Sequence, residues 1–496
     1  MTFWLVCMII TAAMSSSIKF GTDGWRAIIA EDFTFDNVRI CAQAVAQYLK
    51  KDGLDSRGVV IGYDTRFASE DFGAAAAEVL AGNGIKVHLC SKPAPTPVVS
   101  FTVTATGSAG GIVITASHNP ASWNGFKYKS QDGASAPAET IARIEANIAS
   151  LTSAPSVHAR GPAGYVQRLA LDHALREGLV DYADPFPAYC DRLGDLVDMD
   201  ELRRQRLHII VDSMYGAGSG YFKAVLEGGD LKITEINGER NPSFPGINPE
   251  PIARNLSKLS GLIVEQQGGL GLATDGDADR IGIVDEAGRF LTQHQVFALL
   301  CLYLLEVRGE RGALVRTRTS TMMLDRLGKL FGVPVYETSV GFKYVAPLMM
   351  EKNALIGGEE SGGYGFRGHV PERDAILAGL YFLDFMVKTG KRPSQLLDYL
   401  YSKVGPHHYD RSDFHVSADR RDAILGRLSS GPPDSIAGSE VARVDATDGF
   451  RFFLEDGSWL LIRFSGTEPL VRIYAEAESL ERARELLMAG KRLAGL

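Results

Sequence analysis

Short apolar runs alternate with amphipathic stretches along most of the chain. Residues 58–62, 85–89 and 111–115 read GVVIG, IKVHL and GIVIT, and such runs predict buried strands. The Ala-rich residues 72–80 between the first two predict a helix. The same strand pattern recurs at residues 207–211, 269–274, 313–316 and 334–336, with helical connectors at 138–150 and 165–179. Strands that alternate with helices predict α/β units with mostly parallel sheets.

The last ninety residues follow a different pattern. Strand-like runs come close together there, and residues 478–493 predict a closing amphipathic helix; the runs are 407–416, 449–454, 459–464 and 471–475. This predicts a smaller α+β domain at the C-terminus. With the usual domain size, we expect an apolar N-terminal extension, three α/β domains and this α+β domain, with bounds at 1–17, 18–155, 156–305, 306–405 and 406–496.

Composition narrows the function classes. The net charge of −8 argues against general nucleic-acid binding, although a local basic cleft can still hold an anionic substrate. The five cysteines are scattered without a C-x-x-C pair, which argues against a disulfide framework or a zinc site. A reducing cytoplasm is therefore the expected location.

The N-terminus carries an isolated apolar run at residues 3–13. The run is too short to span a bilayer, and no Lys or Arg precedes it as in a signal peptide. We expect Met14 to be the true start, with a weakly anchored extension or a signal peptide as alternatives. No association with a membrane is expected for the rest of the chain.

The segment Thr115-Ala-Ser-His-Asn-Pro120 directly follows a predicted buried strand. Ligands bind at the carboxyl ends of strands in open α/β sheets, so Ser117 is a candidate nucleophile beside His118. An Asn-Pro turn with a capping serine is the alternative interpretation of this segment taken alone.

The segment Asp275-Gly-Asp-Ala-Asp-Arg280 also follows a predicted strand. Three carboxylates at alternate positions can converge on one hard cation. Without a cation or Arg280 they would repel one another, so we expect a metal site at Asp275, Asp277 and Asp279. A solvated acidic turn is the alternative.

Three further segments carry weaker signals. Gly357-Gly-Glu-Glu-Ser-Gly-Gly363 offers sugar-binding side chains on a flexible loop, and Arg463-Phe-Ser-Gly-Thr-Glu-Pro469, with Arg472 beyond it, offers phosphate-binding groups. Gly21-Thr-Asp-Gly-Trp-Arg26 offers a turn and one arginine. Taken alone, the first is equally well explained by a flexible loop, the second by a simple turn between two strands, and the third is best explained by a structural turn with an incidental arginine.

Together and in this order, the five segments resemble those of the α-D-phosphohexomutase family, which includes phosphoglucomutases and phosphomannomutases. The resemblance runs from about residue 20 to the C-terminus and is closest to bacterial-type phosphoglucomutases. Asn124-Gly-Phe-Lys127, Val340-Gly-Phe-Lys343 and Glu372-Arg-Asp-Ala375 are also similar to family segments. The resemblance implies three α/β domains of shared topology and a smaller α+β domain around a central cleft.

The resemblance also implies roles for individual residues. Ser117 would carry the transferable phosphate and, with Asp275, Asp277 and Asp279, hold Mg2+. Glu359 and Ser361 would bind sugar hydroxyls, and Lys343 would face the sugar. The substrate phosphate that is not transferred would be bound by a set of residues on the fourth domain: Arg463, Ser465, Gly466, Thr467 and Arg472.

The implied reaction is an intramolecular phosphotransfer between C1 and C6 of a hexose. Phospho-Ser117 would form a glucose 1,6-bisphosphate intermediate and recover the other phosphate. Lys127, His118 and Lys343 are candidates for proton transfer, and a lysine serves as a base only where its pKa is lowered. Arg26 would contact the phosphoserine loop, and Arg280 the ligand carboxylates or the phosphate.

The substrate and the partners are expectations of the same kind. Glu360 after Glu359 resembles the phosphoglucomutase form of the sugar loop, so glucose phosphates are expected, with mannose phosphates as the alternative. A non-catalytic sugar-phosphate sensor and an aspartate-nucleophile phosphatase are less favoured; in the phosphatase, Asp279 would stand where Thr or Val is usual. We expect small-molecule hexose phosphates as ligands and a monomer or homodimer.

Overall fold

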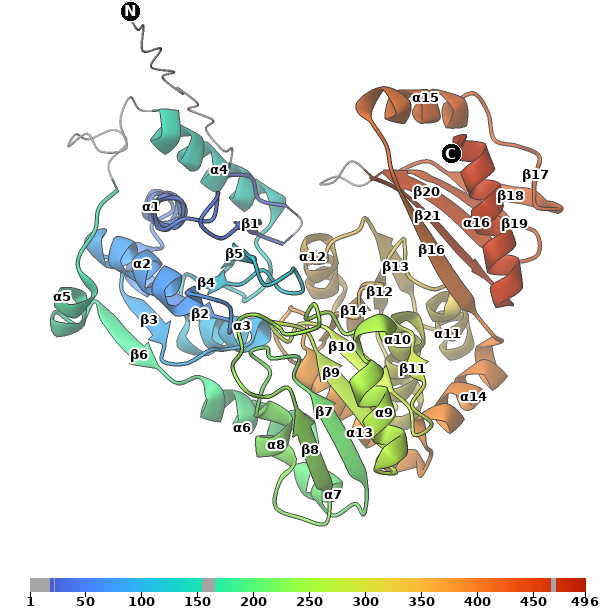
Figure 1. Ribbon diagram of the computed structural model, residues 1–496, viewed down its shortest axis with the longest axis horizontal. Helices are drawn as coiled ribbons and strands as arrows, with labels where there is room; N and C mark the ends of the chain where they lie inside the picture. Colours follow the sequence, from blue (N-terminus) through green and yellow to red (C-terminus); the bar gives the residue numbers. More distant parts are fainter. Residues whose placement is uncertain (1–17, 22, 154–165, 465–469) are drawn as a thin grey trace, which may run out of the picture.

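The computed structural model describes residues 18–21, 23–153, 166–464 and 470–496 (Figure 1). The expected N-terminal extension and the phosphate-loop residues Ser465, Gly466 and Thr467 lie outside these residues. Within them, no helix has the length and apolar character needed to cross a membrane.

The first sheet has the order β1-β5-β4-β2-β3-β6. Its strands are β1 (Trp25–Ile28), β5 (Trp123–Lys129), β4 (Gly110–Ile114), β2 (Val59–Tyr63), β3 (Val87–Cys90) and β6 (Val180–Ala183). All five residues of β2 are buried, because helices cover both faces of the sheet. Gly62 faces Val99 of α3 (Thr96–Thr106), and Tyr63 on the opposite face lies against Gly73 of α2 (Ser69–Gly82). Helices α1 (Phe35–Lys51) and α4 (Ala138–Ser153) complete this domain.

The second and third sheets repeat a core of the first. In the first sheet, β3, β2 and β4 are parallel, and β5 pairs antiparallel with β4. The second sheet repeats this order with β8 (Lys232–Ile236), β7 (His208–Asp212), β9 (Leu270–Thr274) and β10 (Ile281–Val284), and adds β11 (Phe290–Leu291) at its edge. The third consists of β13 (Val335–Thr338), β12 (Leu314–Thr317), β14 (Ile356–Gly358) and β15 (Tyr364–Phe366). The expected shared topology of the three α/β domains is therefore confirmed.

This repeat explains where the sequence motifs lie. In each domain, one motif forms the connection between the third parallel strand and the antiparallel strand: the Ser117 segment follows β4, the Asp275 segment follows β9, and the Glu359 segment follows β14. The three connections leave the carboxyl ends of central strands, where α/β sheets bind ligands. In Figure 1 the sheets are arranged in an arc that brings the first two of these connections close together.

The second and third domains share one large apolar cluster, and each has a smaller cluster of its own on another face of its sheet. Helix α13 (Ala375–Thr389) packs on β9 and β10 of the second sheet and beside α10 (Gln293–Leu302). Its residues Ile376 and Phe382 belong to the same buried cluster as Leu272 and Phe297. Other helices of these domains are α6 (Phe186–Leu196), α7 (Met199–Arg203), α8 (Tyr221–Leu226), α9 (Ser257–Glu265), α11 (Met323–Phe331), α12 (Phe342–Lys352) and α14 (Pro393–Val404).

Two details differ from the expected domain bounds. Strand β6 lies beyond residue 155, yet it pairs with β3 and returns the chain to the first sheet. Helix α10 precedes residue 305, yet it packs against α11 and α14 of the third domain.

Residues 166–179, expected to be mostly helical, form only the short helix α5 (Leu171–Arg176). Long-range packing decides these points, which local patterns do not report.

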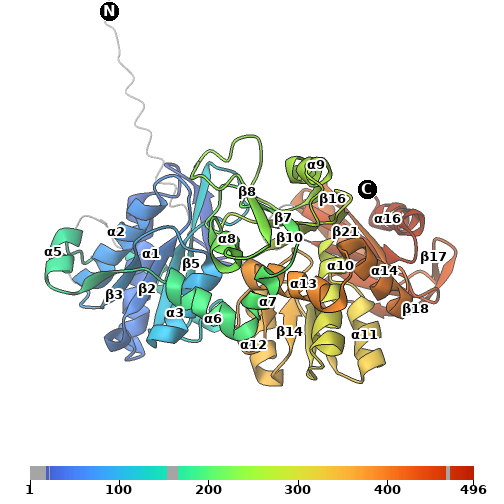
Figure 2. The same cartoon turned by 90° about the horizontal axis from the view of Figure 1, so that it is seen from below.

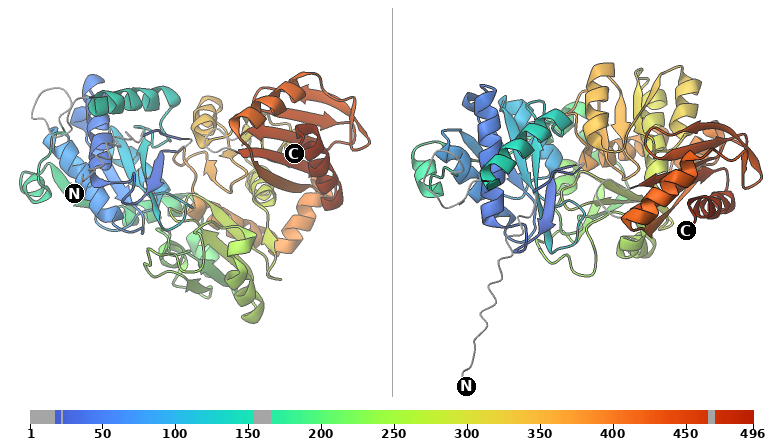
Figure 3. Two further views of the ribbon diagram at one scale, coloured as in Figure 1. Left: turned by 45° about the horizontal axis from the view of Figure 1, so that its top comes forward. Right: turned by 90° about the horizontal axis from the view of Figure 1, so that it is seen from above.

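The fourth sheet is antiparallel and carries both of its helices on one face, as Figure 3 shows. Its order is β16 (His408–His415), β21 (Leu470–Ala477), β20 (Trp459–Phe464), β19 (Phe450–Leu454), β18 (Ser439–Asp445) and β17 (Ser435–Ile436). Helices α15 (Ala418–Ser429) and α16 (Leu480–Ala494) bury this face, leaving Arg463 and Arg472 on the other. The first and fourth sheets lie at opposite ends of the molecule (Figure 2).

Candidate functional site

The Ser117 segment adopts a strained turn at the end of β4. Ser117 has a φ of 52°, in the left-handed region that non-glycine residues avoid. Its amide donates to Thr115 Oγ1 at 2.8 Å, and its side chain is almost completely buried. Ser117 Oγ donates to Asp275 Oδ2 at 2.7 Å and lies 3.4 Å from His118 Nδ1. The strained turn therefore directs the serine hydroxyl at the aspartate segment of another domain.

The aspartate segment approaches the serine segment very closely. An added Cβ on Gly276 would lie 2.4 Å from the carbonyl oxygen of Ser117. Only glycine permits this approach, because any larger side chain would push the two segments apart. The glycine in the first gap of the D-G-D-A-D pattern is thus required by the neighbouring domain.

Asp275, Asp277 and Asp279 are fully buried, and one carboxylate oxygen of each lies within 4.8 Å of the others. Burial raises the pKa of Asp275 well above its ordinary value, and the carboxylates of Asp279 and Asp277 raise it further. Asp277 Oδ1 and Asp279 Oδ1 make no hydrogen bond to any described residue, although both are buried. Converging oxygens of this kind fit a hard divalent cation such as Mg2+.

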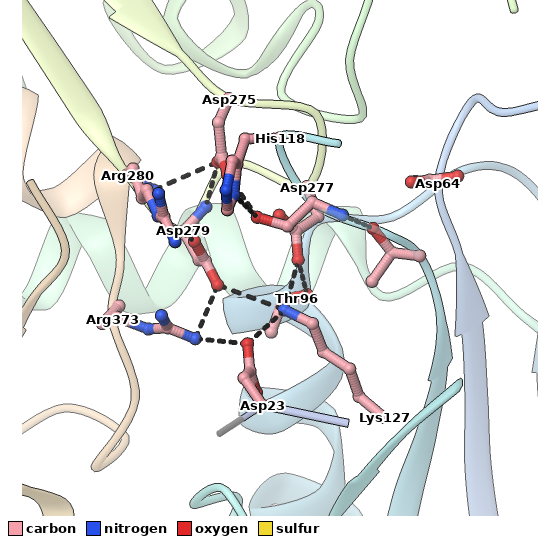
Figure 4. A network of polar contacts seen from close by, with 12 residues as sticks. Asp23, Asp64, Thr96, His118, Lys127, Asp275, Asp277, Asp279, Arg280 and Arg373 are labelled. Atoms are coloured by element: carbon pink, nitrogen blue, oxygen red, sulfur yellow. Dashed lines mark hydrogen bonds and ion pairs between the residues drawn. The ribbon is translucent and has the colours of Figure 1, made fainter. Parts of the chain in front are cut away.

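Two buried cations, Lys127 and Arg373, form a belt beside the aspartates (Figure 4). Lys127 Nζ lies 2.8 Å from Asp277 Oδ2 and 3.3 Å from Asp279 Oδ2. Arg373 Nη2 lies 2.8 Å from Asp279 Oδ2, and both cations also bind Asp23 Oδ2, each at 2.7 Å. Asp23 therefore joins a cation of the first domain to one of the third.

The expected proton-transfer residues differ in their electrostatic setting. Burial alone would lower the pKa of Lys127, but the carboxylates of Asp23, Asp277 and Asp279 outweigh it and raise this pKa. The lowered lysine pKa that a general base needs is therefore not found in this arrangement. Burial lowers the pKa of His118 well below its ordinary value, and the charges of Arg280 and Arg26 lower it further.

Arg26 and Arg280 contact the serine and aspartate segments, respectively. Arg26 Nη1 donates to Asn119 Oδ1 at 2.7 Å, so it contacts the serine segment. Arg280 donates its backbone amide to Asp275 Oδ1 at 3.2 Å, and its Nε lies 3.9 Å from Asp279 Oδ1. Arg26 thus borders the serine segment, and Arg280 borders the aspartate cluster.

The Glu359 segment belongs to the third domain and is tied to the same belt. Glu359 Oε2 lies 3.4 Å from Arg373 Nη1, and burial raises the pKa of Glu359 to about 7. Glu360 Oε2 accepts from Thr317 Oγ1 at 3.1 Å, and Ser361 is partly exposed on the same loop. Lys343 lies apart from the belt at the start of α12, with its Nζ 5.4 Å from the centre of the Tyr344 ring.

The expected phosphate-binding arginines lie together on the fourth sheet. Arg463 on β20 and Arg472 on β21 are cross-strand partners. Arg463 Nε lies 3.0 Å from Asp448 Oδ2, and Arg472 Nε lies 3.8 Å from Asp413 Oδ2. The exposed sheet face therefore presents guanidinium groups held by carboxylates, which is a suitable arrangement for exchanging a carboxylate for a phosphate.

Sequence patterns did not identify several residues of this site. Thr96 Oγ1 donates to Asp277 Oδ2 at 2.5 Å from the start of α3, and no local motif marks it. Asp23 and Arg373 lie inside segments that resemble family motifs, but their mutual contact links residues 350 positions apart. Arg411 on β16 lies beside the phosphate-binding arginines, with its Nε 3.0 Å from Asp413 Oδ1.

Four family models match the chain in succession. They describe phosphoglucomutase/phosphomannomutase α/β/α domain I at residues 17–155, domain II at 187–288, domain III at 292–404 and the C-terminal domain at 427–490. Together they cover most of the chain in the order of the four sheets.

Similar proteins carry several names. A phosphoglucomutase/phosphomannomutase of Thermococcus kodakarensis is 33% identical, covering 96% of this chain and 98% of its own. A phosphoglucosamine mutase of Paracoccus denitrificans is 31% identical, covering 94% and 96%. A crystal structure from Thermus thermophilus, described only provisionally as a phosphomannomutase, superimposes with a TM-score of 0.83 at 36% identity, covering 97% of this chain and all of that one.

Proposed function

The chain belongs to the phosphoglucomutase/phosphomannomutase family of phosphohexomutases, and we propose that it interconverts glucose 1-phosphate and glucose 6-phosphate through phospho-Ser117. The observation that carries this proposal is the 2.7 Å hydrogen bond from Ser117 Oγ to Asp275. It places a buried hydroxyl at a cluster of three carboxylates. A serine in such a position can accept a phosphate whose charge a cation balances.

The residues that would hold Mg2+ are Asp275, Asp277 and Asp279, together with an oxygen of Ser117 or its phosphate. Their fit rests on three converging buried carboxylates, two of which carry an oxygen that makes no hydrogen bond within the described part of the chain. Bound Mg2+ would supply charge neutralisation and polarise a phosphoryl oxygen. Lys127 and Arg373 lie close enough to orient these carboxylates.

The reaction consists of two phosphoryl transfers in opposite directions. In the first, the bond between Ser117 Oγ and phosphorus breaks as a sugar hydroxyl oxygen bonds to phosphorus, which yields glucose 1,6-bisphosphate. The hydroxyl proton passes to a base, and the serine oxygen takes up a proton. After the bisphosphate turns over in the site, the second transfer returns the other phosphate to Ser117. Positioning supplies most of the catalysis in such transfers.

In this proposal His118 is the base, because its lowered pKa keeps the ring neutral, and Lys127, whose pKa is raised by its carboxylate neighbours, serves only as a proton donor. His118 Nδ1 is 3.4 Å from Ser117 Oγ, and Lys127 lies across the aspartate cluster from it. Both belong to the first domain, the domain that carries Ser117. Arg26 would steady the segment between them through Asn119.

The remaining groups would recognise the sugar and its second phosphate. Glu359, Ser361 and Lys343 would face the sugar, and Arg463 and Arg472 would bind the phosphate that is not transferred. Ser465, Gly466 and Thr467 complete the proposed phosphate site. Turnover of the intermediate would then require the fourth domain to open and close about a hinge.

Glucose is proposed as the sugar because Glu360 follows Glu359, as in phosphoglucomutases. Mannose differs from glucose only at C2, so a second, weaker activity is expected. One of the similar proteins is a phosphoglucosamine mutase, which makes glucosamine phosphate the third substrate to test.

The decisive experiment compares turnover of glucose 1-phosphate, mannose 1-phosphate and glucosamine 1-phosphate, with Mg2+ and a trace of the matching hexose 1,6-bisphosphate. Wild type and Ser117→Ala are assayed side by side. Fastest turnover of glucose 1-phosphate that disappears in the variant supports the proposal. A preference for either other sugar would keep the mechanism and overturn the glucose assignment. No turnover of any sugar by folded wild type would overturn the mechanism as well.

A further inference from the structure

A buried ion pair lies directly behind the serine segment, outside the groups assigned so far. Asp64 and Arg66 follow β2, and both side chains are completely inaccessible to solvent. Arg66 Nε lies 3.0 Å from Asp64 Oδ2. Asp64 Oδ1 in turn accepts from the Arg66 amide at 3.0 Å and from Ser69 Oγ at 2.8 Å. The carboxylate therefore fixes the arginine from two sides.

The rest of the Arg66 guanidinium binds backbone oxygens of the serine segment. Nη2 donates to the carbonyls of Ser117 at 2.6 Å and Asn119 at 2.7 Å. Nη1 donates to the carbonyls of Pro120 at 2.8 Å and Trp123 at 3.0 Å. A planar guanidinium has a rigid fork of donors, so four converging carbonyls fix the shape of the segment.

The bond to the Ser117 carbonyl matters because Ser117 is the strained residue. With a φ of 52°, its backbone needs support from both neighbouring peptide groups. Thr115 Oγ1 holds the amide, and Arg66 holds the carbonyl. The same carbonyl lies against Gly276, so its position also sets the spacing between the serine and aspartate segments.

Contacts with the second domain hold Arg66 from the other side. Its guanidinium carbon lies 5.0 Å from the centre of the Phe244 ring. The neighbouring Thr65 Oγ1 donates to the carbonyl of Tyr215 at 2.6 Å. The pair therefore lies at the interface between the two domains whose segments meet at Ser117 and Asp275.

The electrostatics indicate that this pair contributes little to stability for its own sake. Burial raises the pKa of Asp64 and lowers the pKa of Arg66, so desolvation outweighs the mutual attraction in both groups. Buried pairs of this kind often stabilise a fold less than apolar side chains of similar size. The geometry that Arg66 imposes is then the better explanation of its presence.

We infer that Arg66, anchored by Asp64, is a positioning residue that holds the Ser117 segment in the shape required for phosphoryl transfer. The inference rests on the proposed function of Ser117. In phosphorylation of the free enzyme, a sugar oxygen–phosphorus bond of a hexose bisphosphate breaks as the Ser117 Oγ–phosphorus bond forms. The hydroxyl proton goes to the base of the site, and the sugar oxygen takes up a proton. Arg66 touches none of the reacting atoms.

The test uses full-length Arg66→Lys and Asp64→Asn, with Arg240→Ala as the matched control. Arg240 donates to the Thr65 carbonyl of the same loop at 3.4 Å and pairs with Glu70 of α2 at 2.6 and 2.7 Å, without a bond to the serine segment. Glucose 1,6-bisphosphate is added to each dephosphorylated protein, and Ser117 phosphorylation is followed by intact mass. Steady-state kcat and KM and hydrogen exchange of residues 116–123 are measured in parallel.

Arg66→Lys is expected to lower the rate of Ser117 phosphorylation and kcat about 10- to 100-fold, because small misplacements cost this much. KM should stay nearly unchanged, exchange should rise only in residues 116–123, and Arg240→Ala should match wild type. Wild-type phosphorylation and exchange in Arg66→Lys would overturn the inference. If that variant does not fold, the same criteria apply to Asp64→Asn, which keeps the arginine and removes the charge of its anchor. Absence of phosphorylation in wild type would instead overturn the proposed function, whereas the exchange measurement reports on the segment without any activity.

Discussion

The hydroxyl of Ser117 donates a hydrogen bond to Asp275 Oδ2 across 2.7 Å, and the two residues lie 158 positions apart on connections from different sheets. Each residue lies on the connection that follows the third parallel strand of its own domain, β4 for Ser117 and β9 for Asp275. The contact therefore joins equivalent positions of two repeated domains, and the site is formed where their loop ends meet.

Replacing Ser117 by Ala removes the only oxygen at this position that can carry phosphate through the cycle. We expect turnover to fall at least about 1,000-fold, as is typical when a nucleophile is removed. Intact mass should show no phosphate after incubation with glucose 1,6-bisphosphate. Ser122→Ala is the control, because Ser122 is exposed and its backbone carbonyl, which accepts from the Ile29 amide, is kept in the variant. Phosphate on the Ser117→Ala protein would refute the assignment.

Replacing Asp275 by Asn relieves repulsion within the aspartate cluster but removes a metal ligand. The metal-free variant should have a melting temperature equal to or above that of metal-free wild type, because burial and two neighbouring carboxylates disfavour the Asp275 charge. Its stabilisation by Mg2+ should be lost, and half-maximal activity should need about 10- to 100-fold more Mg2+. Thermal scans and activity against Mg2+ concentration measure both effects.

The control is Asp285→Asn, since Asp285 is buried but pairs with Arg289 away from the cluster. It should keep the wild-type response to Mg2+. An unchanged Mg2+ response in Asp275→Asn would show that the cluster is not the metal site.

Glu359 gives the site a pH dependence. Its pKa of about 7 means that its carboxylate gains charge as pH rises through neutrality. A charged carboxylate accepts hydrogen bonds from sugar hydroxyls more strongly than a neutral acid. KM for the hexose phosphate should therefore fall with rising pH in wild type.

The comparison is Glu359→Gln, measured with the same substrate so that titration of its phosphate is common to both proteins. The variant should have a higher KM, and the part of its pH dependence due to Glu359 should vanish. Parallel KM profiles in the two proteins would count against this role for Glu359.

Arg463→Ala tests the phosphate site on the fourth sheet. Losing a charge-assisted bond to phosphate should raise KM about 10- to 100-fold, since such bonds contribute roughly 1.5–3 kcal/mol. Phosphorylation of Ser117 should likewise need a higher concentration of the bisphosphate, and its rate should return to the wild-type value when the bisphosphate is saturating. Arg443→Ala is the control, because Arg443 is an exposed arginine of β18 that lies over Phe453. Equal KM values in the two variants would contradict the proposed site.

Asp23→Asn tests the residue that joins Lys127 to Arg373. Removing its charge leaves two buried cations undercompensated, and we expect a loss of about 3 kcal/mol in the free energy of unfolding. Asp36→Asn removes a pair with Arg39 that is exposed on the aspartate side, and should cost less than about 1 kcal/mol. Chemical denaturation of both variants measures the difference. A similar small loss in both would mean that Asp23 is not a link between the domains.

Local sequence determined the elements and the position of each motif on them. The runs around residues 59–63, 110–114 and 270–274 are short, apolar and bounded or interrupted by glycines, so their strand character needs no distant partner. Motifs that directly follow such strands must lie at their carboxyl ends. The family resemblance then correctly implied three domains of one topology and a smaller α+β domain.

Only the tertiary structure decided which side chains meet. Arg66 reaches carbonyls about fifty positions away, and Thr96 and Asp23 reach carboxylates or cations in other domains. No local pattern marks these contacts, because the partners come together only when the sheets pack. The same packing raises the pKa of Lys127, whereas a lysine serves as a base only where its pKa is lowered. The sequence gives the charged groups of the chain. The fold sets the burial and the neighbouring charges of each group, and these decide its pKa.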